Sequence, residues 1–94
     1  HLMDSIPKAL GELTNLEKLI LQNNKIKELP SELSNLKNLK ELNLSYNQIS
    51  EWDDTFFTLI DLNVLDLDGN PICSKPELVQ KLKMLFQEKV KAFA

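Results

Sequence analysis

Leucine and isoleucine return along this chain at a fixed interval of 23 residues. The block at residues 16–38 reads LEKLILQNNKIKELPSELSNLKN, and its apolar columns recur in the next block and again after residue 61. The columns that keep their phase are Leu16, Leu39 and Leu62; Leu19, Leu42 and Leu65; Leu21, Leu44 and Leu67; Asn24, Asn47 and Asn70; and Ile26, Ile49 and Ile72. So many matches in one register predict a stack of similar structural units.

Each unit is predicted to begin with a short β-strand that has one buried face. Residues 18–22, Lys-Leu-Ile-Leu-Gln, alternate so that Leu19 and Leu21 share the inner face. Asn24 follows where the chain must turn, and its side-chain amide can both donate and accept hydrogen bonds. We therefore expect the asparagine column to be structural, satisfying backbone groups that the turn leaves unpaired.

The second half of each unit is predicted to return through one or two turns of α- or 3₁₀-helix. Leu29, Leu33 and Leu36 have the four-then-three spacing of one helical face. Pro30 suits the first position of a helical turn, where its missing N–H costs little. The predicted unit is therefore strand, turn and short helix.

The second unit departs from the first along its return limb. Trp52 and Phe56 take inner columns that hold leucine in the first unit. Phe57 and Ile60 take outward columns that are otherwise small or polar. These two residues form either an exposed apolar patch or a surface covered by the end of the chain, and the sequence leaves both interpretations open.

The chain enters the pattern in the middle of a unit, because residues 4–15 align with its second half. No strand precedes Ile6, which predicts an unpaired edge on the first strand and apolar side chains without full cover. We expect further repeats upstream in the native protein; the alternative is an edge covered by a partner or a second copy. His1-Leu2-Met3 resembles a remnant of recombinant expression, although Met3 also suits a native start.

The pattern changes at Pro71, and a capping helix is predicted to follow. Ser74 and Glu77 have the spacing of a capping box, in which the two side chains satisfy N–H groups at a helix start. A helix over residues 75–92 would carry an apolar stripe and close the open end of the stack; the stripe comprises Leu78, Leu82, Leu85, Phe86 and Val90, with Phe93 as a further candidate. The expected organisation is 1–3 as the remnant, 4–73 as one half repeat plus about three repeats, and 74–94 as the cap.

The motif L-x-x-L-x-L-x-x-N-x-I begins at Leu16, Leu39 and Leu62. With x-x-L-P-x-x-L-x-x-L between, it resembles the leucine-rich repeat family, and the 23-residue period with Leu29-Pro30 resembles its intracellular class. The resemblance implies an α/β solenoid with a short parallel β-sheet on the concave side, short helical turns on the convex side and a C-terminal capping helix. It also implies a protein–protein interaction module within a larger cytoplasmic scaffold or signalling protein.

Charge is distributed unevenly along the chain. All eleven basic residues are lysine, and none lies between residues 41 and 74, where seven acids lie. Those acids are Glu41, Glu51, Asp53, Asp54, Asp61, Asp66 and Asp68. This segment indicates either a solvated acidic surface or an end that attracts a basic protein partner. The net charge of −3 and the lack of arginine disfavour nucleic acid as the partner.

Residue types that enzymes commonly use are scarce. His1 is the only histidine, and there is no glycine-rich phosphate loop and no C-x-x-C pair. Glu41, Asp66 and Asp68 share one side of the sheet, but carboxylates without a glycine-shaped loop make a poor cation cage. We expect no enzymatic activity, cofactor or metal. No apolar run approaches the roughly eighteen residues of a membrane span, so we expect no membrane contact.

Cys73 is the only cysteine, so no internal disulfide can form and a reducing, intracellular compartment is favoured. It lies in the column of Lys27 and Ser50, which predicts that the thiol points away from the core.

The expected binding surface is the concave face, because close-packed parallel strands backed by bulkier return limbs must curve with the strands inside. The partner-binding candidates are its outward strand positions, Lys18, Ile20, Gln22, Glu41, Asn43, Ser45, Tyr46, Val64, Asp66 and Asp68. Tyr46 is the expected anchor, with Asp66 and Asp68 accepting from basic groups of the partner. The alternative is an architectural role, with self-association through the N-terminal edge or through Phe57 and Ile60.

Overall fold

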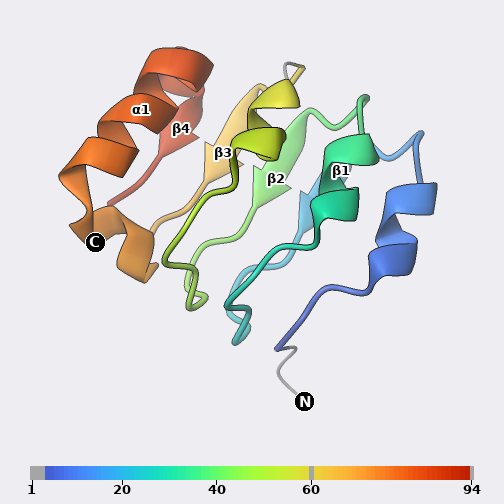
Figure 1. Cartoon of the computed structure of the whole chain (residues 1–94), viewed down its shortest axis with the longest axis horizontal. Coiled ribbons are helices and arrows are strands. Elements are labelled where there is room, and N and C mark those ends of the chain that lie inside the picture. Colours follow the sequence, from blue (N-terminus) through green and yellow to red (C-terminus); the bar gives the residue numbers. More distant parts are fainter. Residues whose placement is uncertain (1–3, 60, 94) are drawn as a thin grey trace.

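The computed structural model describes residues 4–59 and 61–93, with the backbone alone at residues 57 and 58. The chain forms a short solenoid in which each turn runs from strand to return limb and back (Figure 1). The α/β solenoid with a parallel sheet is therefore confirmed. Phe57 and Ile60, the expected apolar patch, lie outside the residues whose side chains are described.

Four parallel strands make a single sheet in chain order, β1 (Lys18–Ile20), β2 (Glu41–Asn43), β3 (Val64–Asp66) and β4 (Val90–Lys91). The repeat sets the register: Leu19 pairs with Leu42, and Leu42 with Leu65. The same row continues from Leu65 to Val90, although residue 90 lies beyond the repeats. Equivalent columns of the sequence therefore stand side by side in the sheet.

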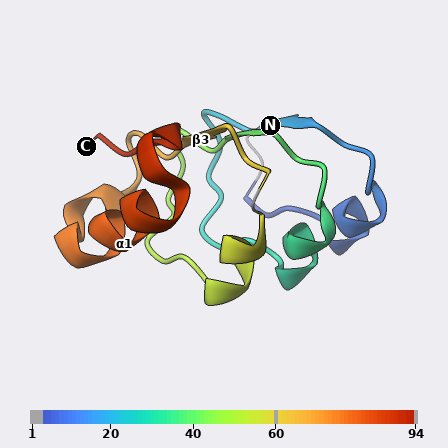
Figure 2. The same ribbon diagram turned by 90° about the horizontal axis from the view of Figure 1, so that it is seen from above.

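Short helices form a second layer on one side of this sheet (Figure 2). They are the 3₁₀ helices η1 (Lys8–Glu12), η2 (Ser31–Asn35), η3 (Asp54–Thr58), η4 (Pro71–Ser74) and η5 (Gln87–Lys89), and the α-helix α1 (Pro76–Phe86). Pro7 and Pro30 precede η1 and η2 in extended conformation, and each carbonyl accepts from the N–H three residues on. Proline thus ends the extended limb and starts the turn.

The core lies between the two layers and is built from the repeating columns. Its most deeply buried side chains are Ile26, Leu33, Leu36, Leu39, Leu42, Leu44, Ile49, Leu59, Leu62, Leu65, Leu67 and Ile72. At roughly 1.5–3 kcal/mol per fully buried aliphatic side chain, these columns supply the main driving force for folding.

The buried asparagines join one coil to the next. Nδ2 of Asn47 donates to the carbonyls of Leu21 at 2.9 Å, Leu44 at 3.0 Å and Ser45 at 3.3 Å. Its Oδ1 accepts from the N–H of Ile26 at 3.1 Å. One amide therefore binds backbone groups of its own coil and of the preceding coil, as expected of a structural column.

Asn70 repeats this arrangement one coil later. Its Nδ2 donates to the carbonyls of Leu44, Leu67 and Asp68, and its Oδ1 accepts from the N–H of Ile49 at 3.1 Å. The structural interpretation of this column is supported in both fully stacked coils.

The predicted continuous helix to residue 92 is wrong. Helix α1 ends at Phe86, Gln87 takes φ 60° and ψ −138°, and the chain re-enters the sheet as β4. The carbonyls of Lys91 and Phe93 accept from the N–H groups of Leu67 at 2.7 Å and Gly69 at 2.8 Å. Ending the helix lets the last strand satisfy the backbone edge of β3, while Val90 still reaches the core.

The predicted capping box is also wrong. Ser74 belongs to η4, and α1 follows an N-cap at Lys75 that has no side-chain cap. The N–H of Lys75 donates to Ile72, and its carbonyl accepts from Val79. Because η4 runs almost directly into α1, the N-cap position falls on Lys75, so Ser74 and Glu77 do not occupy the two positions of a capping box.

The N-terminal coil is the least covered part of the core. Leu16, Leu19 and Leu21 are half-buried, whereas their equivalents in the next two coils are fully buried. Leu13 is 53% exposed. β1 is the first strand of the sheet order, so its outer edge pairs with no other strand in the described part of the chain. The interpretation of this edge as a junction with upstream repeats stays a prediction.

The asparagine column yields a stability prediction. We expect Asn47→Ala to lower the free energy of unfolding by about 3 kcal/mol, because it leaves several buried backbone groups without partners. Ser34→Ala is the control: the Ser34 hydroxyl donates to the carbonyl of Ser31 within its own helical turn, at 2.8 Å, so a loss of about 1 kcal/mol is expected. Urea denaturation of both variants measures the difference, and equal losses would contradict a cross-coil role for Asn47.

Candidate functional site

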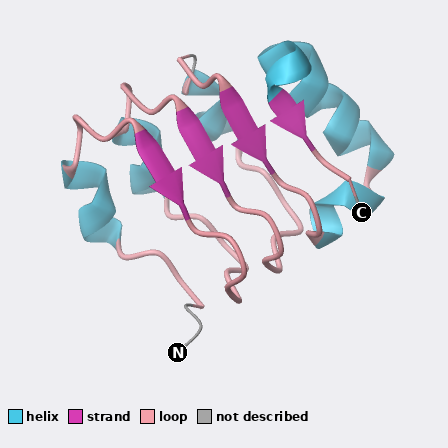
Figure 3. Ribbon diagram, turned by 180° about the vertical axis from the view of Figure 1, so that it is seen from behind, coloured by secondary structure: helices cyan, strands magenta, loops and turns pink. Residues whose placement is uncertain are grey.

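The concave sheet face is open to a partner, since the described helices lie on the other side of the sheet (Figures 2 and 3). Four of the ten predicted positions, Lys18, Ile20, Gln22 and Tyr46, are exposed. Five more, Glu41, Asn43, Val64, Asp66 and Asp68, are half-buried. The strands bring these positions together on one surface, in the rows that the repeat predicts.

Ser45 is the exception, because only 3% of it is exposed. The expectation that it stands free for a partner is wrong. Its hydroxyl and its N–H both donate to Oδ1 of Asn43, at 2.8 and 3.1 Å. Nδ2 of Asn43 in turn donates to Oε1 of Gln22 at 3.0 Å, which links the first two coils. The middle of the face is therefore a connected amide network.

The acidic end of the face has a structural role. Oδ1 of Asp66 accepts from the N–H of Asp68 at 3.1 Å, and Oδ1 of Asp68 accepts from the N–H of Phe93 at 2.8 Å. Lys91 stands beside Asp66 in the register of β3 and β4. One carboxylate that we predicted to bind a partner, that of Asp68, therefore accepts a hydrogen bond from the chain that follows the last strand. The positive charge of Lys91 also lies next to Asp66.

Lys91 and Phe93 extend the rows of this face and were missed by the sequence reasoning. Phe93 is 70% exposed, whereas Val90 is buried and Ala92 half-buried. Val90-Lys91-Ala92-Phe93 alternates apolar and outward residues with period two, which is a strand signal. The helical stripe that runs into Val90 hid this alternation.

Tyr46 takes an unusual backbone conformation. Its φ is 56°, and the equivalent positions Asn23 and Gly69 have φ of 60° and 74°. The ring lies against Gly69: a Cβ built there would be 2.4 Å from Cδ1 of Tyr46. The positive φ favours glycine at residue 69, and the ring beside it leaves no room for a Cβ. The Tyr46 ring packs on Gly69, and 61% of the residue remains exposed.

Cys73 does not point away from the core, contrary to the column-based prediction. It is half-buried against the core, and Sγ donates to the carbonyl of Leu67 at 3.1 Å. The reason is local: Ile72 is the last residue that keeps its column, and Cys73 lies within η4, whereas residues 27 and 50 lie outside any helix.

Metal-binding and membrane-spanning features were sought in the residues that the structure describes. Across residues 4–59 and 61–93, no three His, Cys, Asp or Glu side chains are grouped so that they could hold a metal ion. The helices within the same ranges are too short or too polar to cross a bilayer.

Comparison with known proteins identifies the pattern. The family model described as "Leucine rich repeat" matches residues 7–72. A solved structure of a leucine-rich repeat protein from Leptospira interrogans is similar, with 34% sequence identity and a TM-score of 0.85. That similarity covers 99% of this chain and 23% of the solved chain, so the chain spans about a quarter of its relative's length. No curated protein matches the chain.

The contact between the Tyr46 ring and Gly69 can be tested by a double-mutant cycle. We expect Gly69→Ala to cost about 2–4 kcal/mol of folding stability, partly from the positive φ and partly from the ring. In a Tyr46→Asn background the ring is gone and only about 1–2 kcal/mol should remain. Asparagine is the matched replacement because Asn23 holds the same conformation. Equal costs in both backgrounds, measured by urea denaturation, would show that the ring does not rest on Gly69.

Proposed function

The chain belongs to the leucine-rich repeat family, and from this premise we propose that it binds a protein partner through its concave sheet face. Domains of this family and fold generally mediate protein–protein interaction and are typically non-enzymatic. The specific proposal is a binding module within a larger cytoplasmic scaffold or signalling protein. The lone Cys73 supports a reducing compartment, and the greater length of the solved relative supports a larger parent protein.

One observation carries the proposal: large apolar side chains stand exposed on the face that the described helices leave open. Ile20 is 47% exposed and Tyr46 is 61% exposed, although leucines fill the inner columns of the same strands. Tyrosine supplies a large rigid contact area with a hydrogen-bonding tip, and such residues dominate protein interfaces. The polar network of Gln22 and Asn43 lies between the apolar contacts and orients the partner.

Charge supports a partner with some basic character. Glu41 and Asp66 lie in the sheet rows at the centre and C-terminal side of the face. Lys18 and Lys91, at its two sides, limit the excess of negative charge. We therefore propose a partner that presents apolar groups to Ile20 and Tyr46 and a small number of basic groups to Glu41 and Asp66.

Substitution of the anchor tests this surface. With a partner isolated by affinity capture, Tyr46→Asn should weaken binding at least about tenfold, because a central aromatic contact is lost. Folding should survive, since Asn23 shows that asparagine tolerates this conformation. Met84→Gln is the matched control: Met84 is a 79% exposed apolar residue on α1, away from the sheet. An unchanged affinity for Tyr46→Asn would rule out the concave-face assignment.

A second candidate function is architectural, and the thin cover of the N-terminal coil favours it. Exposed Leu13 and half-buried Leu16, Leu19 and Leu21 lie beside the outer edge of β1, where another strand can pair. Self-association through this edge would bury them.

Light scattering across a concentration series separates the two functions. Assembly through the edge predicts a molar mass that rises with concentration and falls back to the monomer in Leu13→Glu. A strict monomer at the highest concentration would exclude the architectural role and leave the concave-face proposal standing.

A further inference from the structure

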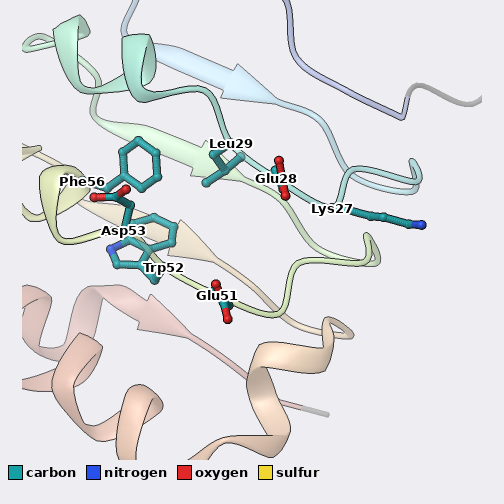
Figure 4. A pocket seen from close by; sticks show the side chains of 7 residues that line it. All are labelled: Lys27, Glu28, Leu29, Glu51, Trp52, Asp53 and Phe56. Carbon is teal, nitrogen blue, oxygen red and sulfur yellow. The ribbon is translucent and has the colours of Figure 1, made fainter.

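A hollow of about 270 Å³ lies between the return limbs of the first two complete coils. Its lining comes from two short segments in equivalent positions of adjacent coils, Lys27, Glu28 and Leu29 from one and Glu51, Trp52, Asp53 and Phe56 from the other (Figure 4). These segments precede η2 and enter η3, so the hollow does not belong to the strand positions of the concave face.

Packed apolar side chains form the floor of the hollow. The rings of Trp52 and Phe56 meet edge to face, with centroids 5.3 Å apart and an interplanar angle of 66°. Trp52 also meets Phe86 of the C-terminal helix at 6.3 Å and 90°. Leu29 lies next to these rings across the coil boundary (Figure 4). The floor is therefore set before any ligand arrives, which lowers the entropic cost of binding.

The rim of the hollow is acidic. Glu28 and Glu51 occupy the same column of adjacent coils, and both are exposed beside the hollow. Asp53 adds a third carboxylate, and Lys27 extends away from the rings (Figure 4). The ion pairs found among the described residues join Lys40 to Glu17 and Lys81 to Asp54, so they leave this rim alone.

Asp53 stays ionised because it caps η3. The backbone N–H of Thr55 donates to Oδ1 of Asp53 at 2.9 Å, and the Thr55 hydroxyl donates at 3.0 Å. These bonds lower the pKa of the Asp53 carboxyl from its ordinary value. The lining of the hollow therefore carries three carboxylates and a single lysine.

We propose that this hollow receives the side chain of an arginine from a partner protein. The aliphatic stem of arginine lies along Leu29 and the exposed edge of Trp52. The guanidinium then lies beside the rim carboxylates, which accept its hydrogen bonds.

Arginine fits this hollow better than lysine does. A guanidinium is more weakly hydrated than an ammonium, can stack on aromatic rings and donates to two carboxylates at once. The chain contains no arginine, so a second copy of these 94 residues cannot supply the occupant. The site stands apart from the concave-face proposal, and either can fail without the other.

The single tryptophan of the chain provides a direct test. The indole N–H resonance of Trp52 is followed by NMR while blocked arginine, N-acetyl-arginine methylamide, is added at low ionic strength. The proposal expects a saturable shift in the millimolar range, as suits one small side chain in a shallow site. The blocked citrulline analogue keeps the shape but lacks the charge, and it should shift the resonance little.

Charge-neutral variants locate the site. The double variant Glu28→Gln/Glu51→Gln should lower the affinity for blocked arginine roughly fivefold, which is within the range of energies measured for exposed ion pairs. Glu12→Gln/Glu88→Gln is the matched control, because it removes two exposed carboxylates from η1 and η5, outside the hollow. It should bind as the parent does.

Several results would overturn the proposal. One is the absence of a saturable shift of the Trp52 resonance, and another is a shift with the citrulline analogue as large as that with blocked arginine. The others are an affinity for blocked lysine or calcium chloride equal to that for blocked arginine, and an equal loss of affinity in the two double variants. Circular dichroism of each variant confirms that the fold is retained, so a lost response can be assigned to the rim.

Discussion

The interaction on which the rest of the structure depends is the hydrogen bonding of a buried asparagine amide to the backbone of two coils. Asn47 and Asn70 each bind three carbonyls and one N–H, and in both cases the bonds cross to the preceding coil. Without these bonds, the turn after each strand would bury unpaired polar groups at a cost of about 1–3 kcal/mol apiece. The amides thereby fix the register in which the leucine columns stack. A coil shifted by one residue against its neighbour would lose all of these hydrogen bonds at once.

This constraint divides the chain into positions that the stack uses and positions that it leaves free. Leucine, isoleucine and asparagine columns recur because each coil must present the same core and the same bonds to its neighbours. Outward strand positions are under no such demand, and they vary from Ile20 through Asn43 to Asp66 along a single row. Any specific recognition on this face therefore depends on residues that do not repeat.

The repeat made most of the fold predictable, and the failures occur where the repeat ends. Period, strand positions, the asparagine role and the return helices follow from columns that constrain one another. Val90 fits both an apolar helical stripe and a strand with alternating residues. The strand forms because the edge of β3 offers backbone groups that a strand can pair with and a helix cannot. The orientation of the Cys73 side chain was predicted from a repeat column, although the repeat ends at Ile72.

The concave face was predictable only in outline, since its strand positions follow from periodicity while side-chain partners do not. Ser45 is hydrogen-bonded to Asn43 two residues before it, and Asp68 accepts from Phe93, which follows a strand that was not expected. The second coil then explains where variation is tolerated. It is covered on both sides, so Trp52 and Phe56 can replace leucine in its core while Tyr46 stands on its open face. The central coil thus combines complete packing with the bulkiest replacements within the repeat columns, because neighbours on both sides bury its core.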